Sequence, residues 1–236
     1  MGSLFVIFFF CIGFSTRVAL AETSSLARHL ALLLANPLNF TADFTQQSFN
    51  SANVLVDRSS GHIVLSRPFH LRWETKKPFT QTIIIKGDRY LQHDADIDQL
   101  IISSLESQDT TIPSLLLSAD ALAIESFFTI SRVDLNPVVG HDHHRDIKSI
   151  NIDNINSTNE LLSLHKHSYV LSPLDKSSLI AELKINFQQQ LITSIVILDD
   201  FGSRSQFVFN NITAPKVLDS ALFELDPPAD TDIIYR

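Results

Sequence analysis

The sequence contains a single cysteine, Cys11, among its 236 residues. It lies inside an apolar run, Leu4 to Phe14, that precedes the small residues of Ala19-Leu20-Ala21. The run is too short to span a bilayer and has the proportions of a signal peptide. We expect cleavage after Ala21, which leaves a mature domain of residues 22–236 without cysteine, able to fold in an oxidising compartment without disulfides. No Lys or Arg precedes the run, so an uncleaved anchor is the alternative.

Glycine and basic residues are also scarce. The chain has six glycines and neither phosphate-loop motif, G-x-x-x-x-G-K-[ST] or G-x-G-x-x-G. The hydrolase motifs G-x-S-x-G and H-E-x-x-H are absent too, and no pattern pairs a serine with a histidine, so we expect no enzyme and no cofactor. With 18 Lys and Arg against 26 Asp and Glu, the formal net charge of −8 argues against nucleic acid or an anionic membrane as the main partner.

What the chain does contain is alternation of apolar and polar residues. Between Gly61 and Glu74, the apolar residues Ile63, Leu65, Phe69, Leu71 and Trp73 all have odd numbers, so they share one parity. Successive side chains of a strand point to opposite faces, so this segment predicts one apolar face and one wet face. Similar segments recur along the chain and predict an antiparallel sheet of roughly ten or more strands, which must curl or close. A curled sheet of this kind either packs a core or encloses one apolar ligand.

Two short segments have helical rather than alternating patterns. Thr23 and Ser24 are suitable N-caps for a helix that runs to about Leu34 and ends before Pro37. The second segment follows Pro113, which suits the first turn of a helix, and contains Leu115, Leu116 and Leu117. Both segments are apolar, so we expect each to lie on the sheet.

Arg67 interrupts the alternation because it has the parity of the apolar face. A guanidinium on such a face needs hydrogen-bond acceptors. Either Pro68 resets the register so that Arg67 points outward, or the apolar face belongs to a cavity that this cation helps to close. Backbone carbonyls at the frayed end of a helix could serve as the acceptors.

Several local patterns, taken in order, resemble the LolA-type periplasmic carriers of outer-membrane lipoproteins over nearly the whole mature chain. They are Phe40-Thr41-Ala42-Asp43-Phe44-Thr45-Gln46; Gly61 with Arg67-Pro68 and Leu71-Arg72-Trp73-Glu74; Gly87, Asp94 and Gln99; Ile112-Pro113 with Leu115 to Leu117; Asp200 and Gly202; and Phe223 with Pro227-Pro228 and Asp232. The chain departs from the family pattern at Leu91, His93 and Asp230, and a polar stretch from about Asp134 to Asn159 resembles an insertion.

The resemblance implies a mainly β fold with short helices: an incomplete, unclosed antiparallel β-barrel covered by an α-helical lid. It implies a monomeric periplasmic chaperone that receives triacylated outer-membrane lipoproteins from an inner-membrane lipoprotein-releasing ABC transporter and delivers them to an outer-membrane receptor. By resemblance Arg67 is the gate, Leu115, Leu116 and Leu117 form the lid, and Leu71 and Trp73 line the lipid cavity. Parity alone adds Phe40, Phe44, Leu65 and Phe69 to the lining.

Other interpretations remain open. The His141-Asp142-His143-His144 cluster could bind a transition metal, with His165 and His167 as further ligands, although a solvated loop and strand-surface histidines explain these residues equally well. An outer-membrane lipoprotein receptor shares the fold but is lipidated through a cysteine at its cleavage site, and this chain has none there. A stress sensor or a small-lipid carrier with the same barrel is a further alternative.

Overall fold

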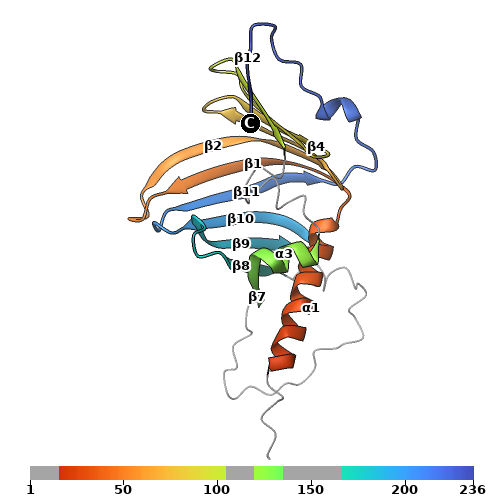
Figure 1. Ribbon diagram of the computed structural model, residues 1–236, viewed down its shortest axis with the longest axis vertical. Helices are drawn as coiled ribbons and strands as arrows, with labels where there is room; N and C mark the ends of the chain where they lie inside the picture. Colours follow the sequence, from red (N-terminus) through yellow and green to blue (C-terminus); the bar gives the residue numbers. More distant parts are fainter. Residues whose placement is uncertain (1–15, 105–119, 135–165) are drawn as a thin grey trace, which may run out of the picture.

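The computed structural model describes residues 16–104, 120–134 and 166–236. Its main element is one 12-stranded sheet with the order β12-β6-β5-β4-β3-β2-β1-β11-β10-β9-β8-β7 (Figure 1). The two end strands, β12 and β7, do not pair with each other, so the sheet is an unclosed barrel. All neighbours are antiparallel except β12 and β6, which run parallel. The predicted fold class is confirmed.

The strand bounds follow the alternating segments of the sequence. The strands are β1 (Asn39–Phe49), β2 (Leu55–Ser66), β3 (His70–Lys77), β4 (Gln81–Lys86), β5 (Arg89–Asp94), β6 (Gln99–Ser104), β7 (Phe128–Asp134), β8 (Lys166–Pro173), β9 (Ile180–Gln188), β10 (Leu191–Asp199), β11 (Arg204–Thr213) and β12 (Asp232–Tyr235). The segment from Gly61 to Glu74, read from the sequence as one strand, is a hairpin of β2 and β3. Its parity survives because Leu65 pairs with Leu71 and Ile63 with Trp73 across the hairpin.

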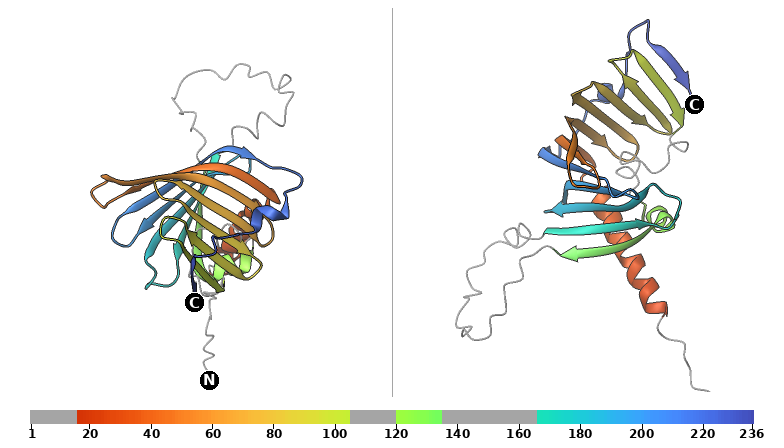
Figure 2. Two further views of the ribbon diagram at one scale, coloured as in Figure 1. Left: turned by 90° about the horizontal axis from the view of Figure 1, so that it is seen from above. Right: turned by 90° about the vertical axis from the view of Figure 1, so that its left-hand side faces the viewer.

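Two described α-helices cover one face of the sheet, which we call the inner face. Helix α1 (Thr16–Ala35) packs against α3 (Ala121–Phe127) and β7, and both helices lie at the β7 end of the sheet (Figures 1 and 2). The C-terminal end of α1 agrees with the prediction, but its start does not, because the helix runs through the expected caps Thr23 and Ser24. The preceding residues include good helix formers and no Gly or Pro to stop the helix. None of the described helices is both long and hydrophobic enough to serve as a transmembrane span.

The core lies between α1 and the inner face. Helix α1 contributes the buried side chains of Ala27, Leu30, Ala31, Leu33 and Leu34. On the sheet, the rings of Phe44 and Trp73 have centroids 4.6 Å apart. They meet over Gly61, where an added Cβ would lie 2.8 Å from Cζ of Phe44 and 1.9 Å from the carbonyl oxygen of Glu74. Only glycine permits this close approach of three strands.

The C-terminal segment covers part of the opposite, outer face. A short 3₁₀ helix, η3 (Ser220–Phe223), packs on β3 and β4 and buries Phe223, whose ring centroid is 5.3 Å from that of His70. The chain then continues to β12 at the edge of the sheet. The two helices therefore cover part of the inner face, and the C-terminal segment covers part of the outer face.

Candidate functional site

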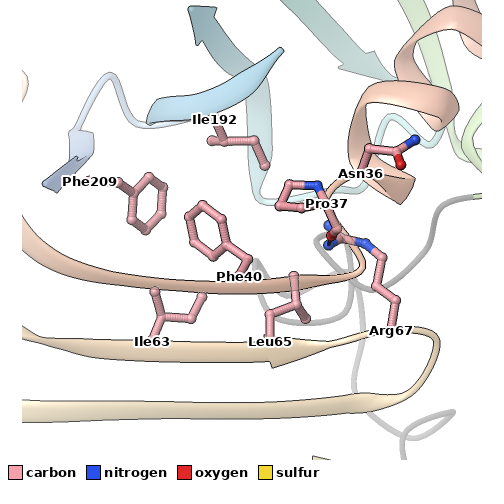
Figure 3. A pocket seen from close by; sticks show the side chains of 8 residues that line it. All are labelled: Asn36, Pro37, Phe40, Ile63, Leu65, Arg67, Ile192 and Phe209. Atoms are coloured by element: carbon pink, nitrogen blue, oxygen red, sulfur yellow. Dashed lines mark hydrogen bonds between the residues drawn. The ribbon is translucent and has the colours of Figure 1, made fainter. Parts of the chain in front are cut away.

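A small apolar cavity lies where the end of α1 meets the inner face (Figure 3). It is lined by Asn36, Pro37, Phe40, Ile63, Leu65, Arg67, Ile192 and Phe209. Its volume is about 10 Å³, which holds about one water molecule. Among the described residues at this end of the inner face, side chains of α1 and the sheet fill most of the space that the sequence predicted to be an oily hollow. An acyl chain could enter only if this packing opened.

Arg67 lies at the edge of this cavity, at the start of the β2–β3 turn, and points toward the end of α1 (Figure 3). Its Nη1 donates a hydrogen bond of 2.8 Å to the carbonyl oxygen of Pro37, and its backbone N–H donates one of 2.8 Å to the carbonyl oxygen of Leu38. Burial lowers the pKa of the guanidinium to about 10, so it stays charged at neutral pH. Of the two positions that the sequence allowed for Arg67, the structure shows the one in which the side chain points inward.

The acceptor of Arg67 follows from the end of α1. Helix α1 ends at Ala35, and Pro37 cannot continue it. The carbonyl group of Pro37 lies in the connection of residues 36–38 between α1 and β1, just beyond the last residue of the helix. The guanidinium therefore ties the connection that directly follows α1 to the β2–β3 turn at the rim of the cavity.

The residues predicted to line the site do not all lie at the cavity. Phe40 and Leu65 line the cavity, while Phe44, Leu71 and Trp73 are buried beside it on the same face. Phe69 does not belong to it: this residue lies in the β2–β3 turn and is 54% exposed. The alternation of the sequence does not predict the position of Phe69, because the turn interrupts the strand. The predicted lid residues Leu115, Leu116 and Leu117 lie outside the described residues.

Sequence reasoning missed part of the lining. Ile192 of β10 and Phe209 of β11 face the cavity, although they are more than a hundred residues from Phe40 in the chain. Their own alternation could have marked them as apolar-facing. Only the pairing of β1 with β11, and of β11 with β10, brings them to this site.

A second contact holds α1 on the sheet nearer its middle. Nδ1 of His29 hydrogen-bonds the hydroxyl of Tyr169 on β8. The ring of His167 stacks on Phe187 with centroids 5.7 Å apart and lies 6.1 Å from the ring of His29. Burial, and then the charge of Arg132, lower the pKa of His29. The lowered pKa favours the neutral form of the His29 side chain.

The structure describes only one of the histidines that the sequence suggested as surface groups or metal ligands. The preference for a strand-surface position is wrong for His167, which is 7% exposed and lies between the rings of His29 of α1 and Phe187 of β9. The His141 to His144 cluster and His165 lie outside the described residues. Within residues 16–104, 120–134 and 166–236, no group of three or more His, Cys, Asp or Glu side chains is arranged to hold a metal ion.

Comparison with known proteins gives the family. The model of the family described as outer membrane lipoprotein carrier protein LolA matches residues 36–140 and 138–226. An outer-membrane lipoprotein carrier protein of Azotobacter vinelandii is 26% identical over 225 residues, which is 95% of this chain and 95% of that protein. One of Pseudomonas paraeruginosa is 25% identical over 230 residues, which is 98% of this chain and 97% of that protein.

A solved structure shows the same fold. An uncharacterized conserved protein from Thermus thermophilus superposes with a TM-score of 0.51 at 12% identity, covering 92% of this chain and 99% of that one. The family match spans most of the chain, from the end of α1 to beyond η3. This chain belongs to the LolA family of outer-membrane lipoprotein carrier proteins.

Proposed function

We propose that this chain is a periplasmic chaperone that shelters the acyl chains of outer-membrane lipoproteins between the two membranes. The observation that carries the proposal is the apolar inner face, which α1 covers and Arg67 helps to close. The family membership and the relatives named as lipoprotein carriers agree with it. Cleavage after Ala21 is part of the proposal, as is a monomeric mature protein of residues 22–236.

The energetics explain why a cover is needed. Each methylene removed from water contributes about 0.8 kcal/mol, so one long acyl chain represents on the order of 10 kcal/mol. A lipoprotein therefore does not cross an aqueous compartment unaided. The inner face offers Phe40, Leu65, Leu71, Trp73 and Phe209 as apolar partners once α1 lifts away.

The same carrier must also release its cargo without a nucleotide of its own. The bond from Arg67 to the carbonyl of Pro37 exists in the closed form, and we propose that it breaks when acyl chains enter. Closure therefore competes with the cargo and keeps the complex reversible. We propose that an ABC transporter of the inner membrane loads the carrier and that a receptor at the outer membrane unloads it.

Native mass spectrometry of the protein isolated from periplasm without detergent tests this function. We expect masses that correspond to the carrier plus triacylated polypeptides. As a control, a lipoprotein whose acylated cysteine is replaced by serine should not co-purify from the same cells. Recovery of the carrier without any acylated polypeptide would contradict the proposal.

A further inference from the structure

The inner face is open at the end of the strands that is far from Arg67. A hollow of about 480 Å³ lies there, between β1 to β5 and the turns β3–β4 and β5–β6. This volume lies in the range of small-ligand sites. Unlike the cavity beside α1, the hollow has polar side chains at seven of its ten lining residues, and Asp57, Asp94 and Asp96 contribute carboxylates to it.

The strand register shows that this lining is one polar row across the sheet. Gln46 pairs with Ser59, Thr75 with Gln81, and Gln81 with Asp94. All five side chains line the hollow. The row therefore crosses β1, β2, β3, β4 and β5 in order.

The polar row lies on the same face as the apolar residues of the core. Gln46 follows Phe44 by two positions on β1, and Thr75 follows Trp73 by two positions on β3. Residues two apart on a strand share a face. The inner face therefore changes from apolar to polar along a single line, as a site for an amphiphilic ligand requires.

The groups in the row can recognise a polypeptide. The hydroxyl of Ser59, a buried residue, donates a 3.0 Å hydrogen bond to Oε1 of Gln46. Carboxamide and hydroxyl groups of this kind can donate to and accept from peptide groups. At the rim, the side chains of Phe79 and Ile97 are 70% and 64% exposed and offer apolar contact.

The carboxylates give the hollow its charge preference. Oδ2 of Asp96 accepts a 3.0 Å hydrogen bond from the backbone N–H of Thr80, and Oδ1 of Asp94 accepts one of 3.2 Å from the backbone N–H of Asp96. These bonds hold both carboxylates at the border of the hollow, Asp94 at the end of β5 and Asp96 in the β5–β6 turn. Negative charge there attracts basic groups and repels acidic ones.

We infer that this hollow holds the polypeptide segment that directly follows the acylated residue of the cargo, and that it favours a neutral or basic segment over an acidic one. The inference rests on the proposed function. Acyl chains belong on the apolar part of the inner face, whereas peptide groups buried there without hydrogen bonds would be unfavourable. The attached polypeptide therefore leaves the apolar part where the polar row begins.

Binding of two synthetic triacylated lipopeptides tests the inference. They carry the same acyl chains and differ in the peptide, which is a run of lysines in one and a run of glutamates in the other. Each displaces a fluorescent fatty acid from the full mature chain. We expect the lysine lipopeptide to bind at least about fivefold more tightly at low salt, with the difference shrinking as salt rises.

The double variant Asp57→Asn with Asp94→Asn keeps the side-chain shape and should remove most of this preference without changing the affinity for the fatty acid. The matched control Asp88→Asn with Asp230→Asn neutralises two exposed carboxylates that do not line the hollow, and it should retain the preference. Equal affinities for the two lipopeptides in the unmodified protein, or a preference that survives in the first variant, would overturn the inference and leave the carrier function standing. Failure of both lipopeptides and the fatty acid to bind would overturn both.

Discussion

Two arginines close in sequence hold different segments on the two faces of the sheet. Nη1 of Arg67 donates to the carbonyl of Pro37 on the inner face. Nη1 of Arg72, on the outer face, donates to the carbonyls of Leu222 and Glu224 at 3.4 and 3.3 Å. The bond of Arg67 is shorter and more buried, and a hydrogen bond to a charged group contributes more where water is excluded. Of the two, Arg67 is therefore better placed to control access to the apolar face.

The substitution Arg67→Leu should slow the release of bound lipopeptide. It removes the charge-assisted bond of the closed form, worth about 1.5–3 kcal/mol, so we expect the loaded form to become about tenfold or more favoured. Transfer of a fluorescent lipopeptide from the carrier to lipid vesicles measures the release rate. Arg72→Leu is the matched control and should release normally, whereas release at the normal rate by Arg67→Leu would contradict a closing role.

At the scale of elements, α1 is held on the sheet by two polar contacts and the apolar side between them. Arg67 fixes the connection that directly follows it, and the bond between His29 and Tyr169 fixes its middle. Leu30 and Leu34, both fully buried, lie between these contacts along the helix. We expect a helix held in this way to detach as a unit and expose the apolar face.

The attachment of α1 should weaken in mild acid. The groups that face His29 are Tyr169, His167 and Arg132, and docking lowers the pKa of His29. In the detached helix the pKa returns toward its ordinary value near 6.5, so the detached state binds the proton more readily. The free energy that holds α1 on the sheet is thus fully present above about pH 6.5. It falls as the pH drops from there toward the lower pKa of His29 in the docked helix.

Hydrogen exchange of the α1 amides at about pH 7.5 and about pH 5.5 measures this effect. We expect faster exchange at the lower pH after correction for the intrinsic rate, and His29→Gln should reduce the difference. His62→Gln, which removes a histidine paired with Asp43 at 2.8 Å on the outer face, is the control and should keep the difference. An unchanged pH dependence in His29→Gln would assign the effect to another group.

At the scale of the whole molecule, each face of the sheet is covered in part, and the apolar part of the inner face must open for an acyl chain to enter. The cavity of about 10 Å³ on the inner face is far smaller than an acyl chain requires. On the outer face Phe223 is buried over β3 and β4, and β12 is anchored at the sheet edge, where the backbone N–H of Asp232 donates to the carbonyl of Asp98 at 2.8 Å. The described residues therefore point to α1 as the cover that moves.

Loading with a triacylated lipopeptide should expose α1 and leave the C-terminal segment in place. We expect amides of residues 27–35 to exchange at least about tenfold faster in the loaded protein, because acyl chains replace α1 on the inner face. Amides of residues 220–235 should exchange as before and serve as the internal control. Stronger protection of α1 on loading would mean that the helix closes over the cargo instead.

The sequence by itself determined the two faces of the sheet, because alternation is a local property of an extended chain. Ile63, Leu65, Leu71 and Trp73 share the inner face as their parity predicts. The end of the N-terminal helix before Pro37 could also be predicted, since proline acts on its immediate neighbours. The family could be named from motifs whose order and spacing are readable without coordinates.

Only the tertiary structure decided which distant groups meet. Phe69 left the apolar face because a turn interrupted its strand, and His167 became buried between the rings of His29 and Phe187. The acceptor for Arg67, the contribution of Ile192 and Phe209, and the near-complete filling of the cavity all depend on strand pairing and side-chain volume. These are properties of segments far apart in the chain, and the local pattern around each residue contains no information about them.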